Sequence, residues 1–387
     1  MWRRLWIIAG IAMPVVGVAG IANALPSQSP TVPWPETNGR IRAVEVVGGT
    51  IYLGGKFTSA TDSAGETQSV DNLAAFDAGT GRWAAFSVPD LVGSGAEVWD
   101  MDVLGDGVVV AGKFTVSSSQ KRLVKVGPTG AQWFSGVSQN LKSVLVAPNG
   151  LVYGGGTKLA AWDAVTRQKV WSGRSTITTN PDLRAHTTNP AYRDLIWKDN
   201  AIYAACQCDA LDGVGVKALV RLFADGAHDP SFAPSGLNVD GAATGLAIAT
   251  DGGDLFLGAG GSDFFASYTT AGTQRWKRDT SGSTQSVEIH QGVAVIGGHF
   301  VEIADQAGDS CGFRSSSGGT LDPNDECQTR KYLAAYELNG TLTSWSPALT
   351  GKYNGVWAIE PEGSALHVGG EFTKASGTAR KFYAKFA

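Results

Sequence analysis

A short apolar segment that ends in two small residues recurs seven times along the chain. The copies are Ile51–Gly55, Val108–Gly112, Leu151–Gly155, Ile202–Cys206, Leu255–Ala259, Ala294–Gly298 and Leu366–Gly370. Successive copies lie about 40 to 70 residues apart, so the smallest repeating unit is about 40 residues, which is the length of a four-stranded propeller blade. A unit of this size cannot bury its apolar face alone, and neighbouring copies must therefore pack on one another.

Each copy is flanked by further strand patterns. Strand-like segments precede it at 42–46, 99–103 and 357–359, and hairpin patterns follow it at 73–86, 159–171 and 333–345. In each hairpin pattern an apolar run ends on an aromatic residue, a turn rich in Gly, Asn or Asp follows, and a second aromatic residue comes after the turn. Glycine at 51 of 387 residues and a charged fraction of only 17% also favour short strands and tight turns.

The two ends of the chain complement each other. The last copy ends at Phe386 without a fourth strand, whereas Val32–Trp34 is similar to Ser344–Pro347, the segment that precedes the last copy. We therefore predict an all-β fold, a seven-bladed β-propeller with four-stranded blades, closed by pairing of the N-terminal strand 31–36 with the C-terminal blade. An open solenoid is the alternative. The blades are expected at 39–87, 96–135, 139–172, 190–233, 242–277, 284–346 and 354–387, within one domain of residues 25–387.

The first 24 residues have the pattern of a secretory signal peptide. Arg3 and Arg4 precede an uncharged apolar run over 7–21, and Ala22–Ala24 has the small-x-small form of a cleavage site. An uncleaved membrane anchor is the alternative. Cleavage predicts a secreted or cell-surface protein without a membrane span. The whole chain has a formal net charge of −4, and losing two arginines makes it more negative, so nucleic acid is not an expected partner.

Two parts of the repeat resemble known propeller families. The hairpins at 73–83 and 159–171 have a pattern similar to Ala-x-Asp-x-x-Thr-Gly-x-x-x-Trp and resemble quinoprotein (PQQ-type) repeats, and Leu53–Thr58 resembles the delta-60 repeat of secreted bacterial propellers. Enzymatically active quinoproteins imply eight blades, an adjacent cysteine pair and calcium ligands. The chain has seven repeats and no adjacent cysteines, so the resemblance implies a fold and no PQQ site.

Four cysteines follow the signal segment, and two disulfides are predicted. Cys311 and Cys327 flank a Gly-, Ser- and Asp-rich insertion, where a bridge closes a long loop. Cys206 and Cys208 lie two residues apart, and their Cα atoms in a regular strand are separated by about 6.6 Å, near the upper limit for a bridge. A local twist permits this second bridge, while small core residues without a bridge are the alternative. A metal site is less favoured, because no nearby histidine completes a ligand set.

Long insertions fall at 58–72, 207–217, 301–331 and 172–189, all of them in connections that open on the same face of a propeller. This loop-rich face is the expected binding surface. The acidic residues Asp305 and Asp309, and the cluster at 322–326, allow calcium, but their spacing matches no known calcium loop and solvated turns are the favoured reading. No cofactor is expected.

The innermost strands of a propeller begin at the same face, and aligning the seven copies places unusual residues at one position near their start. That position holds Arg42, Trp99, Lys142, Arg193, Leu246, Gln285 and Trp357, and Asp100 and Asp194 occupy the next position in two copies. We therefore predict a ring around the channel mouth that recognises an anionic or sugar-like ligand, with indoles for stacking and cations for pairing. His299 is a further candidate on this face. Packing between blades, including an ion pair of Asp194 with a neighbouring arginine, is the alternative role.

No specific catalytic motif accompanies these residues. The favoured function is a non-enzymatic, monomeric binding module that contacts a protein or carbohydrate through its loop-rich face. The alternative is an extracellular lyase or hydrolase that acts on a polysaccharide or a small ester at the channel mouth. A cluster of carboxylates or histidines with perturbed pKa values at the mouth favours the enzyme.

Overall fold

The computed structural model describes residues 25–387, apart from 117–118, 121, 179–188, 239–240, 310 and 312–326. The proposed signal segment therefore lies outside the described residues. The described part of the chain is built from β-strands and contains no helix. It accordingly includes no helix with the length and apolar character needed to cross a membrane.

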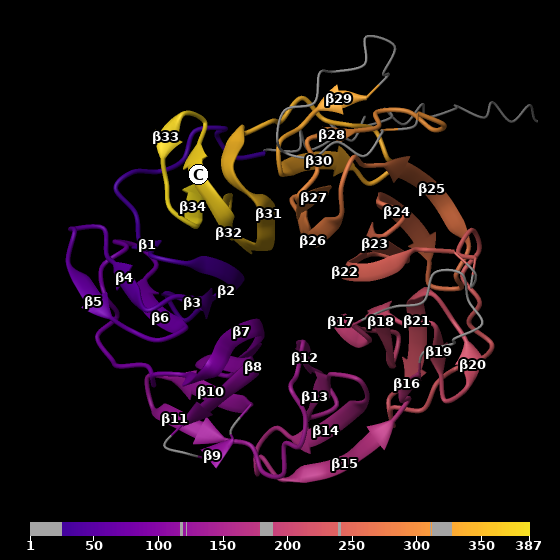
Figure 1. Ribbon diagram of the computed structural model, residues 1–387, viewed down its shortest axis with the longest axis horizontal. Coiled ribbons are helices and arrows are strands. Elements are labelled where there is room, and N and C mark those ends of the chain that lie inside the picture. Colours follow the sequence, from indigo (N-terminus) through magenta and orange to yellow (C-terminus); the bar gives the residue numbers. More distant parts are fainter. Residues whose placement is uncertain are drawn as a thin grey trace, which may run out of the picture.

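Separate β-sheets are arranged in a ring around a central opening (Figure 1). The innermost strands are β2 (Arg40–Val47), β7 (Val92–Leu104), β12 (Ser143–Val146), β17 (Ala191–Lys198), β22 (Thr244–Asp251), β26 (Thr284–His290) and β31 (Leu349–Glu362). Each pairs antiparallel with the strand that carries the repeated apolar segment: β3 (Thr50–Lys56), β8 (Gly107–Val116), β13 (Leu151–Gly155), β18 (Ala201–Gln207), β23 (Asp254–Gly260), β27 (Val293–Gly298) and β32 (Ala365–Ala375).

A third strand extends every one of these sheets outward. The third strands are β6 (Leu73–Asp77), β10 (Leu123–Gly127), β14 (Leu159–Asp163), β21 (Ala218–Phe223), β24 (Phe264–Thr269), β30 (Leu333–Glu337) and β34 (Tyr383–Phe386). A full fourth strand is present as β11 (Gly130–Trp133), β15 (Lys169–Arg174) and β25 (Gln274–Asp279). In each of the other sheets, a single β-bridge to the third strand takes the place of a fourth strand. These bridges join Phe76 with Trp83, Leu222 with His228, Tyr336 with Leu342, and Pro30 with Phe386.

The remaining strands are short accessory strands. They are β1 (Glu36–Thr37), β4 (Ser59–Thr61), β5 (Thr67–Ser69), β9 (Ser119–Gln120), β16 (Ile177–Thr178), β19 (Ala210–Leu211), β20 (Val214–Gly215), β28 (Glu302–Ile303), β29 (Gln328–Thr329) and β33 (Thr378–Ala379). All of them except β1, β9 and β33 lie in the predicted insertions. In the first sheet Arg40 at the start of β2 pairs with Lys56 at the end of β3. The β4–β5 hairpin therefore begins at the end of the ring where the innermost strand starts.

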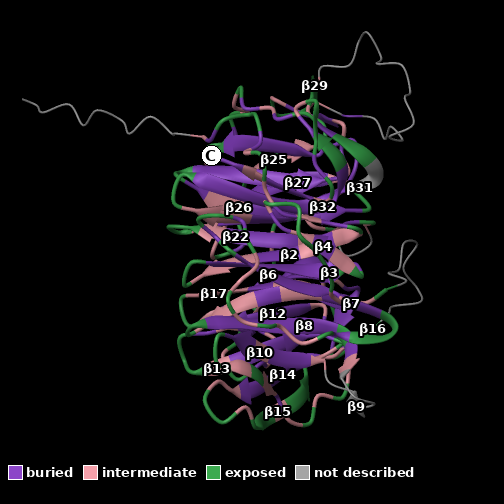
Figure 2. Cartoon of the chain, turned by 90° about the vertical axis from the view of Figure 1, so that its left-hand side faces the viewer, coloured by how far each residue is buried: buried purple, intermediate pink, exposed green. Residues whose placement is uncertain are grey.

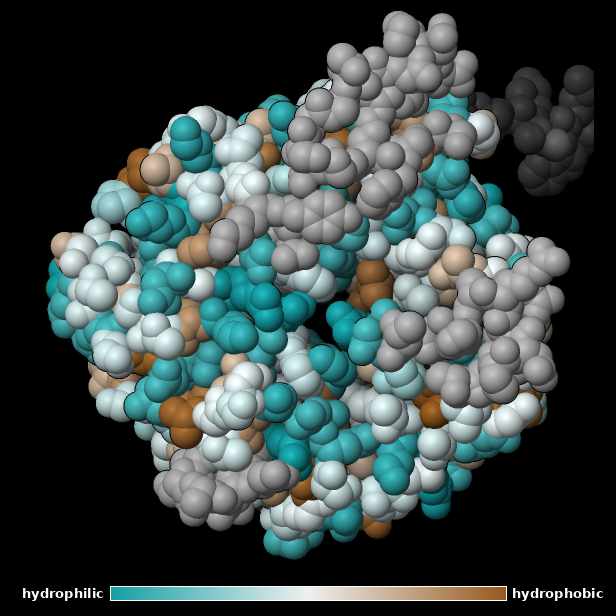
Figure 3. Space-filling model, in the orientation of Figure 1, coloured by the Kyte–Doolittle hydropathy of each residue, from teal (hydrophilic) through white to brown (hydrophobic). Residues whose placement is uncertain are grey.

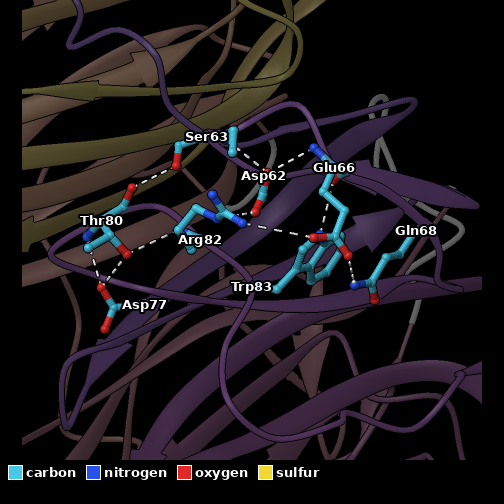
Figure 4. A network of polar contacts seen from close by, with 9 residues as sticks. Asp62, Ser63, Glu66, Gln68, Asp77, Thr80, Arg82 and Trp83 are labelled. Atoms are coloured by element: carbon cyan, nitrogen blue, oxygen red, sulfur yellow. Dashed lines mark hydrogen bonds and ion pairs between the residues drawn. The ribbon is translucent and has the colours of Figure 1, made fainter.

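The β4–β5 hairpin is tied to the outer edge of its own sheet by polar contacts (Figure 4). Arg82 Nε lies 2.8 Å from Asp62 Oδ2, and Asp62 Oδ1 accepts hydrogen bonds from the backbone N–H groups of Ala64 and Glu66, each at 2.9 Å. The indole N–H of Trp83 donates to the Glu66 carbonyl at 3.1 Å. These contacts hold the hairpin in place without a core of its own.

The paired small residues of the repeat have two separate structural roles. The first glycine allows the next sheet to pack closely, since a Cβ at Gly54 would lie 2.6 Å from Val98 of β7 and a Cβ at Gly369 would lie 2.5 Å from Ile41 of β2. The second glycine faces a backbone carbonyl, since a Cβ at Gly55 would lie 2.1 Å from the Arg40 oxygen. Apolar side chains fill the space between successive sheets, and the exposed residues lie mainly at the turns (Figure 2).

The N-terminal segment lies along the last sheet. Thr31 N–H donates to the Lys385 carbonyl at 2.8 Å, and Pro30 forms the bridge with Phe386. This pairing lies closer to the N-terminus than the expected strand 31–36, because Pro33 and Pro35 have no N–H with which to continue a ladder. Residues 36–37 instead form β1 and pair with β4.

Both predicted cysteine pairs lie at disulfide distance. The Cα atoms of Cys311 and Cys327 are 5.8 Å apart, and those of Cys206 and Cys208 are 5.3 Å apart. The second distance is shorter than the value for a regular strand because β18 ends at Gln207, before the second cysteine. Both members of this pair are buried in a cluster that includes Leu211.

Candidate functional site

A β-bulge at the start of the innermost strands directs one side chain per strand toward the channel. The register with the second strand skips one residue at Arg42, Trp99, Arg193, Leu246, Gln285 and Trp357. A bulged residue leaves the ladder and its side chain is re-aimed, which is why bulges often occur at functional sites. The small second residue of the repeat lies opposite this distortion. The bulged residue and the small residue opposite it are therefore two parts of the same β-bulge.

These side chains line a central channel with a volume of about 530 Å³. Figure 3 shows the opening at the centre of the ring, bordered by hydrophilic residues. The lining brings together seven of the predicted site residues: Arg42, Trp99, Asp100, Lys142, Arg193, Asp194 and Trp357.

His299 is not part of the channel lining. Its Nδ1 lies 3.1 Å from Gln285 Nε2, and its Nε2 accepts a hydrogen bond from the Ser283 N–H at 3.2 Å. Burial lowers the pKa of His299 below its ordinary value. The imidazole of His299 therefore lies behind Gln285. It can position the Gln285 amide without contacting a ligand in the channel.

The two indoles of the ring are already covered by cations. Lys142 Nζ lies 2.9 Å from the centroid of the Trp99 ring, and Arg42 Cζ lies 4.0 Å from that of the Trp357 ring. An indole face attracts a cation electrostatically. The indoles therefore position the basic groups, and the expected stacking of a sugar on these faces conflicts with the observed contacts.

Arg42 is neutralised by a carboxylate that we did not predict. Glu97 forms ion pairs with Arg42 and with Arg40, whose Nε and Nη2 donate to the two carboxylate oxygens at 2.7 and 3.0 Å. Burial opposes ionisation of Glu97, but the hydrogen bonds and charges of the two arginines outweigh it and lower the pKa to about 2. Arg40 and Glu97 occupy equivalent positions in adjacent sheets, two residues before the bulge, and this opposite charge is the sequence signal that could have identified the pair.

The side chains of Arg193 and Lys142 have no hydrogen bond or ion pair with any residue that the structure describes. Burial, together with the positive charge of Arg42, lowers the pKa of Arg193 to about 10. Burial, together with the charges of Arg193 and Arg42, lowers the pKa of Lys142 to about 7. Burial and neighbouring cations disfavour the charged forms of these two groups, and an anion placed between them would stabilise those charged forms.

Asp100 and Asp194 join adjacent innermost strands. Asp100 Oδ2 accepts the Val144 N–H at 2.7 Å, and Asp194 Oδ2 accepts the Ile248 N–H at 2.8 Å. The suggested ion pair of Asp194 with a neighbouring arginine does not occur among the described contacts. Both aspartates therefore connect neighbouring sheets through backbone groups, and they border the channel as well.

A second set of acidic residues lines the channel three positions after the bulge. It comprises Glu45, Asp102, Glu288 and Glu360. Burial raises the pKa of Asp102 to about 6 and that of Glu360 to about 8, and it raises those of Glu45 and Glu288 well above the ordinary value, with Glu360 adding repulsion in both cases. Sequence reasoning missed these residues, although their two-residue spacing from Asp100 and its equivalents places them on the same side of the strand.

The raised pKa of Glu360 predicts a loss of stability in alkaline solution. The folded protein binds this proton more tightly than the unfolded chain, so the free energy of unfolding falls as pH rises from the ordinary pKa of about 4.3 through about 8. Glu360→Gln should therefore raise the melting temperature by a few degrees at pH 9 and have little effect at pH 4.

The matched control is Glu337→Gln, which changes an exposed glutamate outside the channel. Its melting temperature should follow the wild-type pH profile in differential scanning calorimetry. Equal profiles for all three proteins would contradict the assignment of Glu360.

Among the described residues, no group of three or more His, Cys, Asp and Glu side chains is arranged to hold a metal ion. Asp309 Oδ2 accepts a hydrogen bond from the Gln306 N–H at 3.0 Å, as in a solvated turn. The acidic residues at 322–326 lie outside the described part of the chain.

The sequence matches no protein-family model and no curated protein. Its fold is similar to solved structures: the WD40 β-propeller domain of Doa1 (11% identity, 88% of this chain, 95% of that chain, TM-score 0.50) and the WD40 repeats of RRP9 (9%, 92%, 98%, 0.52). U3-55K gives a similar result (9%, 92%, 99%, 0.52). Likenesses at these identities show the fold alone, and together with the all-β structure they establish that the chain is a β-propeller.

Proposed function

We propose that the chain is a secreted or cell-surface binding module, and that the channel mouth on its loop-rich face captures a carboxylate group of a partner protein. The single observation that carries this proposal is the pair of half-buried basic side chains, Arg193 and Lys142, that line the channel without a carboxylate partner among the described residues. A guanidinium binds a carboxylate through two parallel hydrogen bonds, and a partly desolvated site strengthens them.

We further propose that the propeller has seven blades and is a closed ring. The seven innermost strands and the contact of Gly369 with Ile41, between the last and first sheets, support this count. The bridge of Pro30 with Phe386 supports closure by the N-terminal segment. The two cysteine pairs at disulfide distance favour an oxidising compartment outside the cell.

A protein carboxylate fits the mouth better than a neutral sugar. Cations cover one face of both Trp99 and Trp357, which removes the stacking surfaces that a sugar ring would need. The similarity to WD40 propellers also favours a protein-binding module. An acidic side chain is small enough to enter a channel of about 530 Å³.

Arg193→Gln tests this proposal. The probe is a short oligoglutamate peptide with blocked ends, and calorimetry should show binding that weakens about 10- to 100-fold in the variant, because one charge-assisted contact is lost. Oligoglutamine of the same length should not bind.

The matched control is Lys169→Gln, which removes an exposed cation from the outer strand β15. This variant should bind oligoglutamate like the wild type. Equal weakening in both variants would show a nonspecific charge effect and overturn the assignment of the site.

The alternative function, a lyase or hydrolase, is favoured by the carboxylates with raised pKa values in the channel. Glu360 has a pKa of about 8 and can act as a general acid at neutral pH. Turnover of a polyuronate or of a small ester by the purified protein, abolished in Glu360→Gln, would support this function. Absence of turnover together with oligoglutamate binding would leave the binding module.

A further inference from the structure

Lys142 has an unusual environment for a lysine. Its side chain is half-buried in the channel lining, with Nζ 2.9 Å from the centroid of the Trp99 ring. The described residues supply neither a carboxylate nor a hydrogen-bond acceptor for this amine. The indole therefore covers one side of Nζ, while the other side faces the channel.

The neighbouring charges disfavour the protonated form of this amine. Arg193 on β17 and Arg42 and Arg40 on β2 repel the ammonium, and Glu97 on β7, which attracts it, is already paired with the two β2 arginines. Burial and these charges lower the pKa of Lys142 to about 7, which favours the neutral amine more than in an ordinary lysine. Desolvation and adjacent cations are the two means by which proteins make lysine a nucleophile.

We infer that Lys142 forms an imine with small 2-oxo acids, whose carboxylate is held by Arg193. The inference rests on the proposed carboxylate site and adds a covalent step to it. A 2-oxo acid carries the two groups that the site complements, a carboxylate for the guanidinium and an adjacent carbonyl carbon for the amine.

The reaction is a condensation that needs no other reactant. The lone pair of Lys142 Nζ adds to the carbonyl carbon, and a proton moves from nitrogen to the former carbonyl oxygen to give a carbinolamine. The C–O bond then breaks as the nitrogen lone pair forms the C=N bond, and the hydroxyl leaves as water with the second proton of the nitrogen. No electron is gained or lost, and hydrolysis regenerates the free amine.

Reductive trapping tests the inference. The full-length mature protein is incubated at pH 7 with pyruvate and sodium cyanoborohydride, which reduces an imine to a stable secondary amine, and the modified lysine is located by peptide mass spectrometry. Lys142 should be modified at least tenfold faster than exposed lysines such as Lys169. Modification spread over the surface lysines, without preference for Lys142, would overturn the inference.

Three comparisons sharpen the result. Lys142→Arg should abolish the selective adduct, whereas Lys169→Arg should not change it. Arg193→Gln removes a charge that lowers the pKa of Lys142, so labelling by both ketones should slow, but labelling by pyruvate should slow about tenfold more than labelling by acetone, which has no carboxylate. Equal labelling of Lys142 by pyruvate and acetone in the wild type would overturn the 2-oxo acid as the ligand.

The outcome also separates the two proposals. Wild-type protein that binds oligoglutamate but forms no adduct at Lys142 would overturn the imine and leave the carboxylate site. An adduct at Lys142 without oligoglutamate binding would overturn the protein-carboxylate proposal and support the reactive amine.

Discussion

Deletion of residues 25–36 is expected to lower the melting temperature by roughly 5–10 °C, corresponding to about 5 kcal/mol. The segment supplies the outermost bridge of the last sheet through Pro30 and Phe386. Its backbone also accepts hydrogen bonds from two buried side chains: Trp345 Nε1 donates to the Pro26 carbonyl at 2.9 Å, and Arg380 Nη2 donates to the Trp34 carbonyl at 2.9 Å. Removing the segment leaves these buried donors without partners.

Side-chain contacts add to the effect of the deletion. The indole N–H of Trp34 donates to the Tyr383 hydroxyl at 3.2 Å, and Lys385 Nζ lies 4.7 Å from the centroid of the Trp34 ring. Trp34→Ala should therefore reproduce a substantial part of the loss. Val32→Ala, in the same segment but 56% exposed, is the matched control and should leave the melting temperature unchanged.

Thermal unfolding followed by circular dichroism measures these differences, and a peptide of residues 25–37 added in excess should restore part of the lost stability. A deletion variant that unfolds at the wild-type temperature would show that the ring does not depend on its N-terminal segment.

The β-propeller architecture could be predicted because the small residues of the repeat are required by the way the sheets pack. Gly54 and its equivalents are small where the next sheet approaches, and Gly55 and its equivalents are small where the bulge brings a carbonyl close. Both requirements are local and recur in successive sheets. They therefore remain visible in a single sequence even though the repeats have diverged.

The ring of channel residues was predictable for the same reason, since the bulge has a fixed place relative to the small residues. The partners of these residues were not predicted. Glu97 lies before the bulge, and only the packing of adjacent sheets brings it to Arg42. The positions of Lys142 and Arg42 over indoles depend on side-chain rotamers, which a strand pattern does not specify.

The position of N-terminal pairing shows a further limit. Similarity of Trp34 to Trp345 predicted pairing of strand 31–36 with the C-terminal blade, whereas the observed contacts with the last sheet are a bridge at Pro30 and a hydrogen bond from Thr31. Register depends on which residues can donate hydrogen bonds, and the two prolines at 33 and 35 exclude that part of the segment. Matching aromatic residues identifies a neighbour but not the register.

Glu97→Gln should destabilise the protein by about 3 kcal/mol at pH 7, because it leaves two partly buried arginines without their shared carboxylate. The lowered pKa of Glu97, about 2, sets the pH dependence. The stability supplied by its charge is fully present above the ordinary pKa of about 4.3 and is lost as pH falls through about 2, so wild type and variant should converge in acid. Urea denaturation at pH 7 and near pH 2 measures this difference.

The same change should strengthen anion binding while it weakens the fold. Freed from Glu97, Arg42 becomes a second guanidinium beside Arg193 at the channel mouth, and oligoglutamate should bind the variant several-fold more tightly. Asp106→Asn is the matched control: it breaks the ion pair of Lys125 with an aspartate that is 49% exposed, and it should cost less than 1 kcal/mol without changing binding. Equal costs for the two substitutions would show that Glu97 is an ordinary surface carboxylate. A stability loss without tighter binding would show that Arg42 does not reach the ligand, and the carboxylate site would then consist of Arg193 and Lys142 alone.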